Sequence, residues 1–221
     1  ISPSLTLPKV LADHMDQIET TQRQTIAINA TPAENLSLRQ SKFGHYPCVP
    51  KNFDYPKDRL GNFLYPLAQI NFSEVPHLDH FPASGYLQFY IAADDMYGLS
   101  FEKDIPSDFR VIFFEDAELE NPNEDMVFLD EVLKGDSSPV DKPHSLKFEL
   151  KTEYVGMGDV KGGSKAGFNM DDIIATHPTL RREVEDAVFR NFSPIGHKIG
   201  GYAYFTQWDP REEDDEKSNY L

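Results

Sequence analysis

The stretch Ser41–Phe72 constrains the fold more than any other part of this chain. Gly44 and Gly61 can adopt positive φ, which most other residues avoid. The stretch also contains four prolines that fix φ and remove backbone donors: Pro47, Pro50, Pro56 and Pro66. Between Ser41 and Pro66 it contains six aromatic residues: Phe43, Tyr46, Phe53, Tyr55, Phe63 and Tyr65. Because aromatic rings bury large faces, we predict an irregular loop held by aromatic packing that ends in a strand at Leu64–Phe72.

A short piece of this stretch is repeated near the C-terminus. The segment His197–Tyr202 reads HKIGGY and has the same x-Lys-apolar-Gly-x-Tyr order as Ser41–Tyr46, which reads SKFGHY. Both copies place a glycine where the chain can turn with positive φ. The repeat predicts an internal duplication with two equivalent glycine turns.

Composition limits the classes of partner. The chain has 221 residues, 39% of them hydrophobic, which is enough to build one sizeable core. Asp and Glu number 37 against 21 Lys and Arg, so the net charge is −16. Such a charge repels nucleic acids and anionic membranes, and it favours a basic protein partner or simply keeps the protein soluble. We expect no nucleic-acid or membrane partner.

The single cysteine, Cys48, cannot form an internal disulfide and suits a reducing cytoplasm. No apolar run approaches the roughly 20 residues that span a bilayer. The first residues lack the basic-then-apolar pattern of a secretion signal. We therefore expect a cytoplasmic protein.

Hydrophobic periodicity predicts two helices, Pro8–Thr20 and Met170–Phe192, the second kinked or divided at Pro178. The predicted strands are Thr25–Ala30, Leu64–Phe72, Tyr86–Ala92, Phe109–Glu115, His144–Val155 and Tyr202–Trp208. Phe109–Glu115 is apolar on both faces, which predicts a central strand. We predict a helix or strand at Met126–Lys134 and a loop at the glycine-rich Gly156–Gly167. The predicted fold class is α+β, mostly antiparallel β-sheet with an internal duplication, flanked by a few helices.

Several motifs follow one another along the chain: SKFGHYP, VPKNFDYP, LYPLAQINF, GYLQFYIAADDMYG, FRVIFFED and HKIGGYAYFTQWDPR. In this order they resemble the YwqG-like family of uncharacterised bacterial proteins, over about Ser41 to Arg211. This chain departs from the family at Gly44-His45, where members usually have Gly-Gly. The resemblance implies an α+β fold and no established activity, and some relatives lie in toxin–immunity neighbourhoods. It also implies that residues 1–221 form one domain that continues past Leu221.

Known catalytic and cofactor motifs fit poorly. The glycines of Gly156–Gly163 do not have the Gly-x-Gly-x-x-Gly spacing of a dinucleotide site. His45 and Cys48 are three residues apart, and a His near a Cys can make a thiolate nucleophile. The sequence marks out no Asn or Asp that would orient the histidine, so we interpret Cys48 as a buried apolar side chain. His77 and His80 would need further ligands to hold a metal ion. We predict no metal or cofactor and assign no catalytic residue.

The residues best suited to bind a ligand flank the two glycine turns. Lys42 and Lys198 occupy equivalent places in the repeat. If the two turns face one another, a cleft between them would be lined by Lys42, Gln69, Lys198, Tyr202, Gln207 and Arg211. The alternative, which we favour, is that the glycines and aromatic residues only direct strand entry and pack the core.

Two functions remain open. The first is a non-catalytic binding or interaction protein, of immunity type, that offers its acidic surface to a basic partner. The second is a small-ligand-binding protein or an enzyme that uses the cleft between the glycine turns. A deep pocket with converging Lys, Gln and Tyr groups would favour the second function, whereas a flat acidic face would favour the first.

Overall fold

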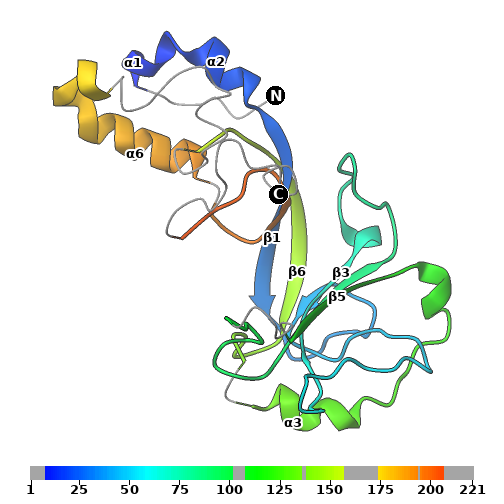
Figure 1. Cartoon of the computed structure of the whole chain (residues 1–221). Coiled ribbons are helices and arrows are strands. Elements are labelled where there is room, and N and C mark those ends of the chain that lie inside the picture. The colour runs from blue at the N-terminus through cyan, green and yellow to red at the C-terminus, as the bar shows by residue number, and fades with distance from the viewer. Residues whose placement is uncertain (1–7, 102–107, 136–137, 157–173, 194, 207–221) are drawn as a thin grey trace. The chain divides into compact units, whose positions relative to one another are not determined.

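The structure is a computed structural model that describes residues 8–101, 108–135, 138–156, 174–193 and 195–206 (Figure 1). Its strands are β1 (Arg23–Pro32), β2 (Lys42–Phe43), β3 (Tyr65–Asn71), β4 (Tyr86–Ile91), β5 (Phe109–Phe114), β6 (His144–Glu153) and β7 (Lys198–Gly200). Its α-helices are α1 (Lys9–Ala12), α2 (Met15–Thr20), α3 (Asp130–Leu133) and α6 (Arg181–Phe192). Short 3₁₀ turns lie at Phe72–Glu74, Asp116–Leu119, Val127–Leu129 and Pro178–Leu180. The predicted α+β class is confirmed.

The strands follow the order β5-β4-β3-β2-β6-β1-β7. The pairs β1–β7, β2–β3, β2–β6, β3–β4 and β4–β5 are antiparallel, as predicted. The chain forms two compact units. Unit 1 comprises Ile1–Ala27 and Leu150–Leu221, and unit 2 comprises Ile28–Glu149. Strands β1 and β6 have residues in both units.

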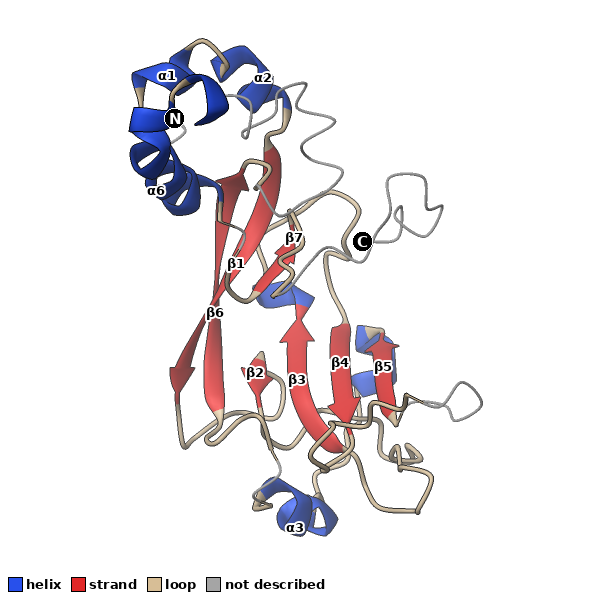
Figure 2. Ribbon diagram, turned by 60° about the vertical axis from the view of Figure 1, so that its left-hand side comes forward, coloured by secondary structure: helices blue, strands red, loops and turns tan. Residues whose placement is uncertain are grey.

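Unit 2 contains the strands β3, β4 and β5, which lie side by side (Figure 2). On β4 the face with Tyr86, Gln88 and Tyr90 is buried, whereas the alternate residues are half-buried. The predicted aromatic packing is present, because the ring of Tyr55 meets four others edge-on: Phe53, Phe63, Tyr90 and Phe128. The irregular loop before β3 is thus part of the core, as the prolines and aromatic residues predicted.

The predicted central position of Phe109–Glu115 is wrong. This segment forms β5, the first strand in the sheet order, and pairs with β4. Phe109 and Val111 are 50% and 53% exposed, so apolar residues on both faces did not mean burial on both faces.

Unit 1 contains α1, α2 and α6 (Figure 1). Their core contains Leu11 of α1, Ile18 of α2, and Val184 and Phe192 of α6, together with Ile174 and Tyr154. The predicted helix Pro8–Thr20 is divided by a turn in which the His14 N–H donates to the Leu11 carbonyl at 3.0 Å. The division at Pro178 is confirmed, since a 3₁₀ turn begins there and α6 follows.

The predicted strand Tyr202–Trp208 is absent as far as it is described, to Thr206. The Tyr202 N–H donates to Glu153 Oε2 at 3.0 Å, so a carboxylate takes the place of a strand partner. Residues 207–208, and residues 157–167 of the predicted glycine-rich loop, lie outside the described residues. The remaining predicted strands are present, and Met126–Lys134 is helical. No described helix is long and apolar enough to cross a membrane.

Candidate functional site

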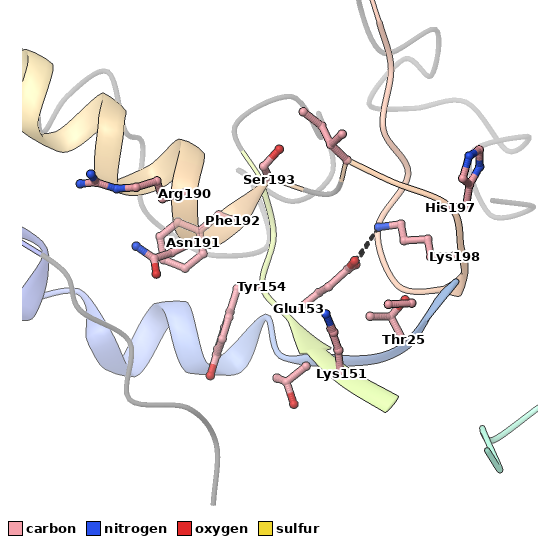
Figure 3. Close-up of a pocket in the computed structure, with 13 residues that line it drawn as sticks. Thr25, Lys151, Glu153, Tyr154, Arg190, Asn191, Phe192, Ser193, His197 and Lys198 are labelled. Carbon is pink, nitrogen blue, oxygen red and sulfur yellow. Dashed lines mark hydrogen bonds and ion pairs between the residues drawn. The ribbon is translucent and has the colours of Figure 1, made fainter. Parts of the chain in front are cut away.

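A polar cleft of about 330 Å³ lies in unit 1, beside the C-terminal end of α6 (Figure 3). The strands β1, β6 and β7 contribute Thr25, Ala27, Lys151, Thr152, Glu153 and Lys198, and Tyr154 and His197 adjoin them. The end of α6 and the segment after it contribute Arg190, Asn191, Phe192, Ser193 and Ile195. We call this hollow the unit-1 cleft.

An ion pair between two strands forms one wall of the unit-1 cleft. Lys198 Nζ lies 2.8 Å from both carboxylate oxygens of Glu153 (Figure 3). The two side chains are only 13% and 18% exposed. Glu153 Oε2 also accepts the Tyr202 N–H, so one carboxylate holds both β7 and the segment that follows it. The pair is partly desolvated, and removing one partner would leave a charge without compensation.

The turn after β7 brings the backbone close to this carboxylate. Gly201 has φ +74°, in the left-handed region that favours glycine. A Cβ at Gly201 would lie 2.9 Å from Thr25 Cβ and closer still to Glu153 Oε2. The Tyr202 hydroxyl then donates to the Thr21 carbonyl, and the Arg23 guanidinium carbon lies 4.4 Å from the centre of its ring. The glycine is therefore required for both turn conformation and close packing.

The charge of the unit-1 cleft is opposite in sign to that of the chain. Three described lining residues are cationic, Lys151, Arg190 and Lys198, whereas Glu153 is the one carboxylate among them. The carbonyl end of α6 offsets part of this excess through its partial negative charge. The Ser193 hydroxyl adds a hydrogen-bonding group, whereas the Asn191 amide already donates to the Ala187 carbonyl at 2.7 Å and the Thr25 hydroxyl to the Ile199 carbonyl at 3.2 Å. The arrangement can bind a small anion by charge and hydrogen bonds.

Lys42 and Gln69 are opposite one another in the β2–β3 pair of unit 2 and are 1% and 2% exposed. Lys42 Nζ donates to the carbonyls of Ser37 (2.8 Å) and Leu38 (2.7 Å). Gln69 Nε2 donates to the carbonyls of Leu38 (3.0 Å) and Gln40 (2.9 Å). Together the two side chains fix the loop that precedes β2.

The hydrogen bonds of Gln69 continue to β4. Its Oε1 accepts from the Cys48 N–H at 2.7 Å and from Gln88 Nε2 at 2.8 Å, and Gln88 Nε2 also donates to the Cys48 carbonyl. The Tyr90 hydroxyl donates to Gln88 Oε1. Cys48 is buried, as predicted, and burial raises the pKa of its thiol. This buried hydrogen-bond network explains why Gln69 on β3 and Gln88 on β4 occupy core positions that usually have apolar residues.

Burial also lowers the pKa of Lys42 to about 8, although nearby Cys48 and Glu74 oppose the shift. Burial, together with the charge of Lys42, lowers the pKa of His45 below its ordinary value. Among the described residues no group of three or more His, Cys, Asp or Glu side chains is placed to hold a metal ion.

The six predicted ligand-binding residues fall into three groups. Lys198 lines the unit-1 cleft, and Tyr202 is joined to it through Glu153. Lys42 and Gln69 lie together in the core of unit 2. Gln207 and Arg211 lie outside the described residues.

Sequence reasoning missed Glu153, Arg190 and Asn191 as cleft residues. Alternation along the predicted strand His144–Val155 places Glu153 on the same polar face as Lys151, and no short-range signal links it to Lys198. The two glycine turns do share positive φ, +57° at Gly44 and +72° at Gly200. The duplication stays a prediction: of the second strand that it requires, residues 202–206 are not in strand conformation, and residues 207–208 lie outside the described residues.

Comparison with known proteins gives a family but no activity. No curated protein matches the sequence. A family model described as a domain of unknown function matches residues 41–221. The match begins at the motif SKFGHYP and leaves out α1, α2 and β1. The match covers most of the chain, and the protein therefore belongs to the DUF1963 family.

Proposed function

We propose that this protein is a binding protein of YwqG-like type that takes a small anionic ligand, a phosphate or a carboxylate, in the unit-1 cleft. One observation carries the proposal. Three cationic side chains and one carboxylate line the cleft, in a chain whose net charge is −16. A local charge excess opposite to that of the whole chain is a means of attracting a small anion.

The size of the unit-1 cleft supports a small ligand. Its volume of about 330 Å³ is near the lower limit of the roughly 300–1,000 Å³ that is typical of small-molecule sites. Lys151 belongs to β6 and Arg190 to α6, so the two cationic residues come from different elements of the cleft lining, and we expect a ligand with two anionic oxygens to be the best test of both. The partly buried Lys198–Glu153 pair supplies a fixed polar wall.

Isothermal titration calorimetry with inorganic phosphate and with succinate tests the proposal. We expect saturable binding of at least one of the two anions by the unaltered protein. Arg190→Gln and Lys151→Gln should each weaken this binding by about tenfold, the effect of losing one charged hydrogen bond of about 1.5 kcal/mol. Arg182→Gln on the same helix and Lys147→Gln on the same strand are the matched controls, because both residues are exposed and neither lines the cleft.

Absence of binding for both anions at millimolar concentration would overturn the proposal. Binding that Arg182→Gln weakens as much as Arg190→Gln would also overturn it, because that result would trace the affinity to net charge and not to the cleft.

A second candidate function is association with a basic protein, as an immunity-type inhibitor would require. It is favoured by a run of exposed carboxylates in unit 2: Glu115, Asp116, Glu118, Glu120, Glu124, Asp125 and Glu131. Within residues 115–131 no lysine or arginine offsets them. An acidic surface of this kind speeds association with a basic partner.

A further inference from the structure

The two terminal strands in the sheet order, β7 and β5, differ in how they resist pairing with another chain. β7 is three residues long and contains Lys198 and Gly200, and short or charged edge strands resist such pairing. β5 is six residues long, and its register against β4 is uninterrupted from Phe109 to Phe114. It contains no proline or glycine, and Arg110 is its one charged residue. β5 is therefore the less protected edge.

One face of β5 is apolar and exposed. Phe109, Val111 and Phe113 alternate along the strand and are 50%, 53% and 42% exposed. Opposite them on β4 are three half-buried apolar residues: Leu87, Phe89 and Ile91. Figure 2 shows β4 and β5 side by side at the end of the row of strands. A continuous apolar face at a strand edge is typical of a protein interaction surface.

We propose that β5 pairs antiparallel with β5 of a second copy of this chain, so that the two apolar faces join across a two-fold axis. A second copy suits this edge because the strand is complementary to itself. Its residues are β-branched or aromatic apart from Arg110, which favours an extended partner of the same kind. The pairing would be isologous, with each copy using the same surface.

The alternation of side chains selects one register. Residues directly opposite in an antiparallel pair have side chains on the same face. In a symmetric pair one residue of β5 lies opposite itself, on the two-fold axis. The apolar faces overlap well when that residue is Arg110, Val111 or Ile112. Arg110 on the axis places two like charges opposite each other, which is unfavourable. Ile112 on the axis places Phe109 opposite Glu115. Val111 on the axis pairs Phe109 with Phe113 twice and brings all the exposed apolar residues together.

The area and charge predict a weak dimer that salt strengthens. Two phenylalanines and a valine at about half exposure contribute roughly 250 Å² per copy, or about 500 Å² in all. Stable interfaces bury about 1,200 Å² or more, so an interface of this size predicts a weak, transient dimer that forms only in concentrated protein. Each copy has net charge −16, and salt screens the repulsion between them.

Sedimentation velocity from 1 to 300 µM, in 0.15 M and 0.5 M NaCl, tests the pairing. The unaltered protein should pass from monomer to dimer, at lower concentration in the higher salt. Val111→Lys places like charges on the axis and should raise the dimerisation midpoint at least tenfold. Val127→Lys, at a 70% exposed valine of unit 2 outside β5, is the matched control and should leave the midpoint unchanged.

Cysteine cross-linking tests the register. Val111→Cys should form an inter-chain disulfide under mild oxidation, because residue 111 faces its own copy. Phe109→Cys should not, whereas Phe109→Cys mixed with Phe113→Cys should form the mixed dimer. Cys48 is fully buried and should not interfere.

Three results would overturn the proposal. One is a monomer at 300 µM in both salts, and another is a dimer that Val111→Lys leaves intact. The third is a protein that stays monomeric although the β5 amides that point away from β4 are protected from hydrogen exchange. A segment of the same chain would then cover that edge of β5.

Discussion

Lys42 shows how a single side chain can serve structure at an electrostatic cost. Its ammonium group lies in the core of unit 2, and its named acceptors are the two backbone carbonyls of Ser37 and Leu38. Neutral carbonyls compensate a buried charge less than a carboxylate would. The contrast with Lys198, which meets both oxygens of Glu153, is plain. The two lysines of the sequence repeat therefore have different electrostatic roles.

The lowered pKa of Lys42 predicts a pH dependence of stability. Between pH 8 and the ordinary pKa of 10.5, the unfolded chain binds the proton on Lys42 and the folded protein does not. The contribution of Lys42 to the free energy of unfolding therefore rises with pH across this window, by about 3 kcal/mol in all. Urea unfolding of the unaltered protein and of Lys42→Met, at pH 7.5 and pH 10.5, measures it.

The comparison with Lys42→Met removes the opposing effect of Cys48. Burial raises the pKa of that thiol, so the unfolded chain releases its proton first and stability falls as the pH rises. Both proteins contain Cys48, so the difference between them reports the loss of the Lys42 charge, including the lowering of the thiol pKa that this charge causes. A difference in unfolding free energy that stays constant with pH would contradict the prediction.

At the scale of elements, the turn after β7 fixes the wall of the unit-1 cleft. Gly201 allows the chain to approach Thr25 and Glu153, and Glu153 then accepts from both Lys198 and Tyr202. The cleft thus depends on a glycine that lies beside it and not only on the residues that line it.

Gly201→Ala should destabilise the protein more than Gly61→Ala. Both glycines have positive φ, +74° and +89°, so both alanines incur the backbone strain of about 1 kcal/mol. Only the Cβ at 201 also meets other atoms, and we expect a further cost of about 1–3 kcal/mol there. Thermal unfolding monitored by circular dichroism gives both values, and equal losses would show that the close approach is relieved without cost.

At the scale of the whole molecule, charge separates the proposed interactions. The unit-1 cleft is cationic, the run of carboxylates in unit 2 is acidic, and β5 contains one charged residue. Ionic strength therefore acts in opposite directions. It should weaken anion binding and association with a basic partner, and it should strengthen the pairing of two β5 strands.

The acidic run predicts salt-dependent capture of a basic probe. An eight-residue lysine peptide should associate with the unaltered protein at a rate that falls steeply between 0.02 and 0.2 M NaCl. The triple variant Glu120→Gln, Glu124→Gln and Glu131→Gln should associate several-fold more slowly in stopped-flow measurements. Its melting temperature should change little, because all three residues are exposed.

The matched control removes three carboxylates elsewhere: Glu19→Gln, Glu34→Gln and Asp95→Asn. It has the same net charge as the first triple variant. If the two triple variants slow association equally, net charge alone and not the acidic run attracts the peptide.

The sequence by itself determined the α+β class, most strand and helix positions, the division at Pro178 and the burial of Cys48. These follow from hydrophobic periodicity, proline geometry and turn chemistry, which act between residues close in sequence. The edge position of β5 could not be predicted from its apolar pattern, because that pattern reports hydrophobicity and not what covers each face. Only the tertiary structure decided that Lys42 is buried while Lys198 lines a cleft. That difference depends on Glu153, which is 45 residues from Lys198 and reaches it only through folding.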